Sequence, residues 1–248
     1  MKRRQVLGGV AGMVALSGCL GSASDGEHPW PVVDEERLAE WERLSERSDE
    51  YNVSYRGIDA LTVHERTYTY DYTELRESVA ELSQGEIDRS LARFVASRMT
   101  LEGVGRRFVT PERLVDDALD GVESGLKDRG MESIERVEPG SPLPDVDGEI
   151  VEYRGETDIP SFSREIDVSG FSTTIEFAGE PLETEGVFAV WKPEVDTAYV
   201  AGGVFPLADA LETLVPESAG IDLVDLLDLE FDPAEFRETF VSLIETTG

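Results

Sequence analysis

The 248-residue sequence contains few of the residue types from which most catalytic and metal sites are built. It has one cysteine, two histidines, three lysines, two glutamines and one asparagine. A single cysteine excludes an intramolecular disulfide, and its place at position 19 assigns it to a targeting segment rather than to a thiol active site. The histidines, His28 and His64, form no H-E-x-x-H motif, so we expect no multi-histidine zinc site within one chain.

Sequence motifs of serine hydrolases and of nucleotide-binding proteins are also missing. Residues 121–125, Gly-Val-Glu-Ser-Gly, do not have the G-x-S-x-G spacing and fall within a predicted helix. Residues 103–107 contain two of the three glycines of a dinucleotide-binding loop and lack the third. We therefore interpret residues 103–107 as an ordinary loop and predict that the protein has no cofactor.

Carboxylates are the reactive groups that the chain has in excess. Its 53 aspartate and glutamate residues could supply many acid–base pairs or cation ligands, so their number identifies no particular site. Residues 145–149, Asp-Val-Asp-Gly-Glu, are similar to part of a calcium-binding loop, but the first ligand position would be Leu143, which cannot bind a cation. We predict a solvated turn there and no metal site.

The charge balance indicates the solvent in which the protein works. Only 22 lysine and arginine residues oppose the 53 acidic ones, giving a net charge of −31, which excludes a nucleic acid as a natural partner. Molar salt shortens the Debye length to about 3 Å and removes most of the self-repulsion. Scarce lysine and amides along the whole chain predict a halophilic protein, and an acidic mesophilic protein is the alternative.

The amino terminus has the three parts of an export signal. Lys2, Arg3 and Arg4 are followed by an apolar run at residues 6–16, which is too short to cross a bilayer, and by Leu16-Ser17-Gly18-Cys19. We therefore predict that residues 1–18 form a cleaved signal peptide. Removing these 18 residues, of which three are basic and none acidic, leaves 230 residues with a net charge of −34.

Two resemblances make this signal more specific. Arg3-Arg4-Gln5-Val6-Leu7 resembles a twin-arginine export motif, although Val6 stands where that motif usually has phenylalanine, so the general secretory route is an alternative. Residues 16–19 resemble a lipobox, which implies that Cys19 carries a membrane lipid and that the protein faces outside the cell membrane. A signal that is cleaved without lipidation is the other interpretation.

The mature chain then divides into a tether and one domain. Residues 19–31, rich in glycine and serine, are predicted to be the lipidated cysteine and a flexible tether, and residues 32–248 a single globular domain. Asn52-Val53-Ser54 is an N-x-S sequon around the only asparagine, which makes Asn52 a candidate glycosylation site in an exported protein. Chance occurrence explains so short a motif equally well.

The first half of the domain is predicted to mix helices and one strand. Residues 34–47 are expected to be helical because Leu38, Trp41 and Leu44 recur at a spacing of three. Residues 61–72 alternate and predict a strand. Further helices are expected at 74–82, at 86–99 after a break at Gln84-Gly85, and from the N-cap Thr110 to Gly130.

The second half is predicted to be strands followed by helices. Residues 131–205 read as consecutive strands, in which residues 171–177 alternate, whereas 186–191 and 199–205 have no polar alternation and indicate central strands covered on both faces. Short helices are expected at 207–215 and 221–227, and a last helix after Asp232-Pro233. This order predicts an α+β fold with a mostly antiparallel sheet and helices packed on it.

One set of side chains is a candidate ligand face. Tyr68, Tyr70 and Tyr72 lie on one side of the predicted strand at 61–72, where they could bind a sugar or a lipid moiety. The alternative is that a helix covers this face. His64 lies on the same side and is expected to be packed or at the rim of the sheet.

Taken together, the signal, the lipobox, the acidic composition and the apolar strands at 187–191 and 199–205 resemble an uncharacterised family of halophilic archaeal lipoproteins. The resemblance implies no activity. We predict a lipid-anchored, extracytoplasmic protein that binds an envelope protein or glycan or maintains the envelope, without a catalytic motif. The alternative is an anchored hydrolase that uses a carboxylate pair, which would require two convergent carboxylates in a cleft.

Overall fold

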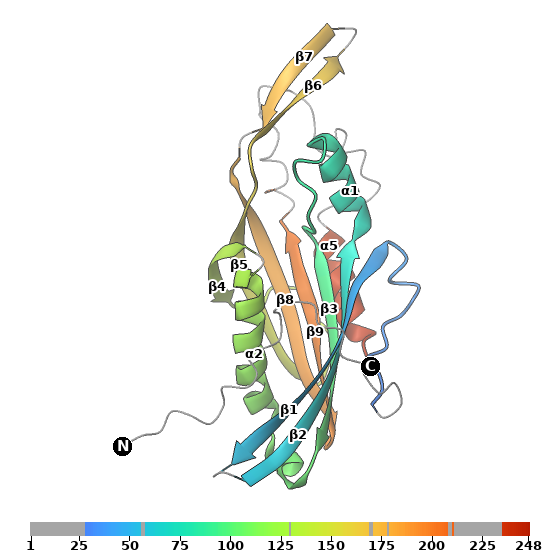
Figure 1. Cartoon of the computed structure of the whole chain (residues 1–248), viewed down its shortest axis with the longest axis vertical. Coiled ribbons are helices and arrows are strands. Elements are labelled where there is room, and N and C mark those ends of the chain that lie inside the picture. Colours follow the sequence, from blue (N-terminus) through green and yellow to red (C-terminus); the bar gives the residue numbers. More distant parts are fainter. Residues whose placement is uncertain are drawn as a thin grey trace, which may run out of the picture.

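The computed structural model describes residues 28–55, 58–128, 130–168, 171–177, 179–207, 210 and 235–248 (Figure 1). Arg3, Arg4 and Cys19 therefore lie outside the described residues. The helix predicted at 221–227 also lies outside them, as does most of the helix predicted at 207–215. Asp232-Pro233, the predicted start of the last helix, lies outside them too.

One antiparallel sheet of seven strands forms the body of the domain, in the order β1-β2-β3-β9-β8-β5-β4. Its strands are β1 (Trp41–Tyr55), β2 (Ile58–Tyr72), β3 (Arg93–Glu102), β4 (Met131–Val137), β5 (Gly148–Asp158), β8 (Pro181–Glu194) and β9 (Thr197–Pro206). The strands β6 (Phe162–Val168) and β7 (Phe171–Phe177) pair only with each other, and this hairpin extends beyond one end of the sheet (Figure 1).

Helices cover the two faces of the sheet unequally. α1 (Thr73–Leu82) and α5 (Phe236–Glu245) pack on the face that carries Tyr70, Tyr72 and Phe94, which we call the aromatic face. α2 (Pro111–Asp128) packs on the opposite face over β4, β5 and β8, and we call this the α2 face (Figure 1). A short 3-10 helix, η1 (Val104–Phe108), follows β3.

The aromatic face is filled by interlocking rings. Phe240 of α5 is fully buried and meets Trp41 edge to face at 5.3 Å between ring centroids, and it contacts Phe205 at 4.7 Å. Tyr72 packs edge to face against Trp41 and against Phe236 of α5. Such ring pairs add to the free energy gained by burying the rings themselves, so this face forms the larger part of the core.

The α2 face has a second apolar cluster. Leu119 and Leu126 of α2 pack over Met99, Tyr153 and Phe188 of the sheet. Tyr153 is fully buried, and burial raises the pKa of its hydroxyl to about 12. This cluster occupies only part of the face, because farther along β2 and β3 the inward positions are polar.

The predicted α+β fold with a mostly antiparallel sheet is confirmed. The helices predicted at 74–82 and from Thr110 onward match α1 and α2, and the break at Gln84-Gly85 has left-handed backbone at both residues. β8 and β9 are buried on both faces along most of their length, as their lack of alternation predicts.

Two predicted helices are wrong. Residues 41–55 form the edge strand β1 instead of a helix at 34–47, because the side chain of Leu44 is exposed and the spacing of three marks no buried stripe. Residues 93–102 form the central strand β3 instead of part of a helix at 86–99. This strand buries Phe94 on one face and Leu101 on the other, and such two-sided burial hides the alternation of a strand.

Among the described residues, no helix combines the length and the apolar character needed to span a bilayer.

Candidate functional site

A pocket of about 270 Å³ opens at the end of the α2 face where β3 and β8 begin. Its lining contains two arginines, three hydroxyl side chains and five aliphatic or thioether side chains: Arg89, Ser90, Leu91, Arg93, Leu126, Met131, Thr157, Leu182, Thr184 and Val204. Leu91 and Leu182 belong to the core cluster of the aromatic face, whereas Leu126 and Met131 belong to that of the α2 face. The pocket therefore lies where the two clusters meet.

Strand alternation and one loop bring these residues together. Arg93 of β3 pairs with Val204 of β9, and Thr157 of β5 pairs with Leu182 of β8, so each strand pair contributes two residues to the pocket lining. The loop from Ser83 to Ala92 adds Arg89, Ser90 and Leu91 to the lining. This loop is held where the Ile87 amide donates to Oγ of Ser83 at 2.9 Å.

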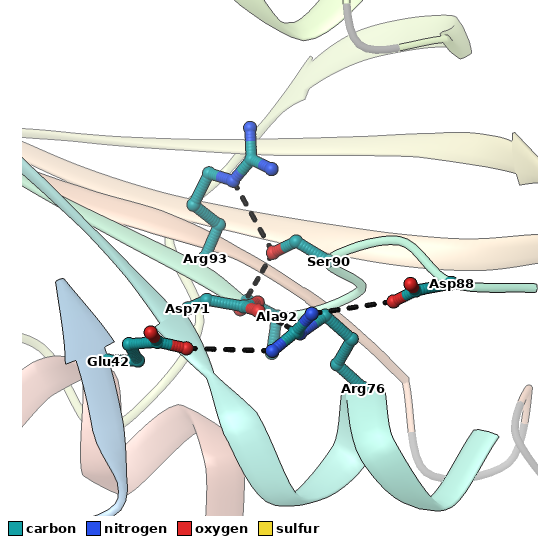
Figure 2. A network of polar contacts seen from close by, with 7 residues as sticks. All are labelled: Glu42, Asp71, Arg76, Asp88, Ser90, Ala92 and Arg93. Atoms are coloured by element: carbon teal, nitrogen blue, oxygen red, sulfur yellow. Dashed lines mark hydrogen bonds and ion pairs between the residues drawn. The ribbon is translucent and has the colours of Figure 1, made fainter. Parts of the chain in front are cut away.

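A buried ion pair lies next to the loop from Ser83 to Ala92 (Figure 2). Asp71 of β2 is fully buried, and Nε of Arg76 from α1 lies 2.7 Å from its Oδ2. Arg76 also reaches Glu42 at 3.5 Å and Asp88 at 3.4 Å. Burial raises the pKa of the Asp71 carboxyl, while the nearby Ser90 hydroxyl and the charges of Arg76 and Arg93 act in the opposite direction.

Arg93 links this network to the pocket. Its Nε donates to Oγ of Ser90 at 3.4 Å, and Ser90 in turn donates to the backbone oxygen of Ala92 at 3.3 Å. Figure 2 shows the two terminal nitrogens of Arg93 directed away from Asp71 and Arg76. Burial lowers the pKa of the Arg93 guanidinium, partly offset by the charge of Asp71, and an arginine stays protonated at neutral pH despite such a shift.

Arg89 supplies the second positive charge. Its NH2 group donates to the backbone oxygen of Asp158, whereas its buried Nε has no hydrogen-bond partner among the described residues. Burial lowers the pKa of this guanidinium as well, because removing the charge from water disfavours the protonated form. An unsatisfied buried N–H favours the binding of an acceptor.

The electrostatics of this pocket differ from those of the whole chain. Its lining carries two arginines and no acidic residue, although acidic residues outnumber basic ones 53 to 22 in the sequence. The volume equals about nine water molecules, or a ligand of roughly eight heavy atoms. Guanidinium groups beside aliphatic walls suit a small molecule with an anionic head and a short apolar tail.

A larger cavity has the opposite character. It measures about 470 Å³ between residues 36–40 and α5, and four glutamates and one arginine lie in its lining: Glu36, Arg37, Glu40, Glu235 and Glu238. No buried polar group without a partner points into it among the described residues. We interpret it as part of the solvated acidic surface.

The three candidate tyrosines do not share one environment. Tyr70 and Tyr72 are buried in the aromatic core, and Tyr72 donates to Glu40 at 2.8 Å, so its pKa is raised by burial and by the neighbouring carboxylates. Tyr68 is half-buried and stacks on Trp30 at 4.8 Å. Helices and the segment before β1 therefore cover this face and leave no room for a ligand at Tyr70 and Tyr72.

The end of the predicted tether is packed against the sheet. Pro31 is buried, Trp30 lies under the guanidinium of Arg66 at 4.8 Å, and Val32 exchanges backbone hydrogen bonds of 2.7 and 2.9 Å with Gly248. Residues 28–31, which the sequence places in the tether, thus contact β2.

Two buried carboxylates converge on the aromatic face. Glu152 of β5 and Glu185 of β8 both bind the guanidinium of Arg237 from α5. Glu152 also accepts a hydrogen bond from the Gly140 amide at 2.9 Å. Since one arginine bridges both carboxylates and neither lines a described cavity, the arrangement serves as a structural ion pair.

The only two histidines of the chain lie in contact. Their imidazole rings stack with centroids 3.8 Å apart, and one nitrogen of each ring and one oxygen of Glu102 all lie within 4.8 Å of one another. His28 and His64 are far apart in the sequence, which is why their spacing predicts no site with several histidines. The structure brings both to one set of metal-ligand side chains.

Asn52 lies on the exposed edge strand β1. Its Oδ1 accepts a hydrogen bond from Thr62 at 2.8 Å, so the amide nitrogen that a glycan would modify faces away from this contact.

Sequence reasoning missed the arginine pocket. Arg89 and Arg93 are spaced by four residues within the helix predicted at 86–99, a spacing that places two residues on the same side of a helix. Residues 89–93 contain two arginines and a serine and no acidic residue, although the chain is very acidic. This local excess of positive charge is the signal that could have identified the pocket.

Residues 30–248 match the family described as a domain of unknown function, DUF6517, so the chain belongs to that family. No curated protein matches the chain. Two solved structures to which this chain is similar are the di-domain ARO/CYC proteins BexL, from the BE-7585A biosynthetic pathway, and StfQ, from the steffimycin biosynthetic pathway. Each structure is 10% identical to this chain and matches 83% of it. The match covers 78% of BexL with a TM-score of 0.17 and 87% of StfQ with a TM-score of 0.14. At these TM-scores the likeness carries no information on function.

Proposed function

We propose that this member of the DUF6517 family is a lipid-anchored protein of the outer cell surface that binds a small amphipathic anion in its arginine pocket. The observation that carries the proposal is the lining itself: two partly buried arginines and five aliphatic or thioether side chains, without an acidic residue. In a chain of net charge −31, such a lining is explained by the need to attract an anion.

The lining of the pocket requires two properties of its ligand. The arginines require a planar anionic head, such as a carboxylate, which can accept paired N–H groups. The walls formed by Leu126, Met131 and Leu182 require a short hydrocarbon tail. A free short-chain carboxylic acid satisfies both requirements within the available volume.

Calorimetry with hexanoate in multimolar salt tests this function. Wild-type protein should bind hexanoate and should not bind hexanamide, which has the same shape without the charge. Arg93→Gln should weaken binding by about tenfold or more, the effect of losing one charged hydrogen bond. Arg107→Gln, at an exposed arginine of η1, is the matched control and should leave binding unchanged. Equal binding of hexanoate and hexanamide would contradict the proposal.

The predicted export signal and lipobox support the cell-surface location, and η1 is consistent with it. Val104 and Phe108 are 80% and 76% exposed, beside Arg106 and Arg107. Exposed apolar side chains next to arginines suit contact with an anionic lipid surface. Cys19→Ser should release the protein from native-host membranes into the soluble fraction, and continued membrane association would exclude a lipid anchor.

Glycosylation of Asn52 remains part of this proposal. A glycan on the edge strand β1 would also hinder pairing with other chains. Mass spectrometry of protein from the native host should show an added mass that Asn52→Gln lacks, and identical glycan-free masses would exclude modification.

The hydrolase alternative has less support. It requires a cleft with two convergent carboxylates. Of the pairs that the structure describes, Glu152 and Glu185 are bridged by Arg237, and Glu40 and Glu74 meet at the hydroxyl of Tyr72. We therefore favour binding over hydrolysis.

A further inference from the structure

We propose that His28, His64 and Glu102 form a binding site for a zinc-like transition-metal ion, separate from the arginine pocket. In the part of the chain that the structure describes, this is the one group of three or more metal-ligand side chains whose donor atoms lie together, within 4.8 Å. The group uses both histidines of the chain, which are 36 positions apart. In a chain with only two imidazoles, their meeting beside a carboxylate points to a role as ligands.

His64 and Glu102 are already spaced for a shared ion. Nε2 of His64 lies 3.7 Å from Oε2 of Glu102, which is too long for a hydrogen bond. Two ligands at the usual zinc distances of about 2.0–2.2 Å in tetrahedral geometry lie roughly 3.4 Å apart. An ion therefore fits between these two atoms with a small inward movement of Glu102, whose side chain is 56% exposed.

Glu50 lies beside the other nitrogen of the His64 ring. Its Oε2 lies 3.4 Å from Nδ1 of His64, on the opposite side of the ring from Glu102. A carboxylate that accepts the proton of one ring nitrogen leaves the other nitrogen unprotonated and directs it at the metal. We infer that Glu50 takes this positioning role when a metal is bound; the side chain of His64, on β2, is only 17% exposed.

His28 supplies the third ligand by a small rotation. Its ring is stacked nearly parallel to that of His64, at an angle of 16°, so the nitrogen lone pairs of the two rings run side by side. One nitrogen of His28 already lies within 4.8 Å of the donor atoms of His64 and Glu102, so a rotation of the ring can bring it to a shared ion. The side chain of His28 is not buried, and residues 30–32, which follow it, are fixed to the domain by Trp30 and Val32.

The ligand set determines the class of ion. Two imidazoles and one carboxylate, with a fourth position left for water, suit zinc and neighbouring transition metals, whereas Mg²⁺ and Ca²⁺ prefer oxygen ligands. Binding would join residue 28 to β2 and so fasten the start of the domain to the sheet.

Zinc titration of the full protein, followed by calorimetry and by proton NMR, tests the site. Sulfate should replace chloride as the concentrated salt because chloride also binds zinc. We expect one zinc ion per chain and a shift of the resonances of both histidines, which are easily assigned because there are only two. Mg²⁺ at the same concentration should shift neither.

Variants separate a built site from binding to the acidic surface. His64→Ala should abolish the stoichiometric binding, and Glu50→Gln should weaken it by about 10–100-fold, as loss of an orienting carboxylate does. Glu132→Gln, at an exposed carboxylate of β4, is the control and should bind zinc like wild type. Far-ultraviolet circular dichroism checks that each variant is folded.

Two results would overturn the proposal. One is the absence of any zinc-dependent change in the histidine resonances. The other is equal zinc affinity in wild type and in folded His64→Ala, which would mean that the ion binds carboxylates elsewhere. Neither result bears on the arginine pocket, because no residue is shared between the two sites.

Discussion

The two faces of the sheet bury different chemistry along the same strand. On the aromatic face, β2 presents Tyr70 and Tyr72 to rings from β1, β3 and α5. On the α2 face, β2 presents Glu65 and Asp71, which are buried with polar partners. Along this strand the aromatic face is therefore stabilised mainly by ring packing, whereas the α2 face buries two carboxylates, neither of which lines the pocket.

Helix placement explains the difference. α5 brings Phe240 down onto β9 at Gly203, where a Cβ atom would overlap both the Phe240 ring and the backbone oxygen of Arg93. α2 instead covers β4, β5 and β8 and leaves the ends of β3 and β9 at the pocket. Because Gly203 has no side chain, Phe240 can pack directly on β9 and cover the aromatic face. The position of α2 leaves the pocket end of the α2 face uncovered.

Removal of salt should have the largest effect, and it should act on both faces together. Dialysis from molar to millimolar salt restores repulsion among the excess carboxylates, which opposes the compact state. We expect cooperative loss of the circular dichroism spectrum and of the buried-tryptophan fluorescence in one transition. A full spectrum at low salt would contradict the interpretation as a halophilic protein.

Truncation on the aromatic face should cost more stability than truncation at the pocket. Phe240→Ala should lower the free energy of unfolding by about 3–5 kcal/mol, because it leaves a cavity among Trp41, Phe94 and Phe205. Denaturant unfolding in molar salt measures this. Phe108→Ala, at an exposed phenylalanine, should change it by less than about 0.5 kcal/mol.

Truncation at the pocket should have a smaller effect on stability and should change ligand preference. Met131→Ala should lower the free energy of unfolding by about 2 kcal/mol, since the side chain borders a space that is already open. The enlarged pocket should bind octanoate more tightly than hexanoate in calorimetry. An unchanged preference would mean that the ligand tail does not reach Met131.

The smallest effect should appear as a pH dependence on the α2 face. Burial raises the pKa of Glu65 above its ordinary value, although hydrogen bonds from Ser97 and Thr67 act against it. The folded chain therefore holds this proton more tightly than the unfolded chain, and stability is lost as pH rises through the folded pKa. Glu65→Gln should remove that loss.

Urea unfolding at several pH values measures this difference. Glu65→Gln should be more stable than wild type at pH 8 and should converge with it at acidic pH, where Glu65 is protonated. Glu132→Gln on β4 is the exposed control and should show no such pH-dependent gain. A variant less stable than wild type at pH 8 would show that Glu65 is stabilising as a charged group.

Local patterns predicted much of the fold and little of the site. Proline, glycine and capping signals identified α1 and α2, and unbroken apolar runs identified β8 and β9 as central. Trp41 suggested a helix at 34–47, and Phe94 falls in the helix expected at 86–99, yet both lie in strands whose burial follows from partners distant in sequence. Arg89, Arg93 and the two histidines acquire meaning only through contacts across strands, which no local spacing encodes.

A crystal structure grown with 6-bromohexanoate would show directly whether the arginine pocket binds an amphipathic anion, because bromine is located by its anomalous scattering. We expect bromine between Leu126, Met131 and Leu182, with the carboxylate at Arg89 and Arg93. An empty pocket at saturating ligand, or bromine found only elsewhere on the protein, would contradict the proposed function.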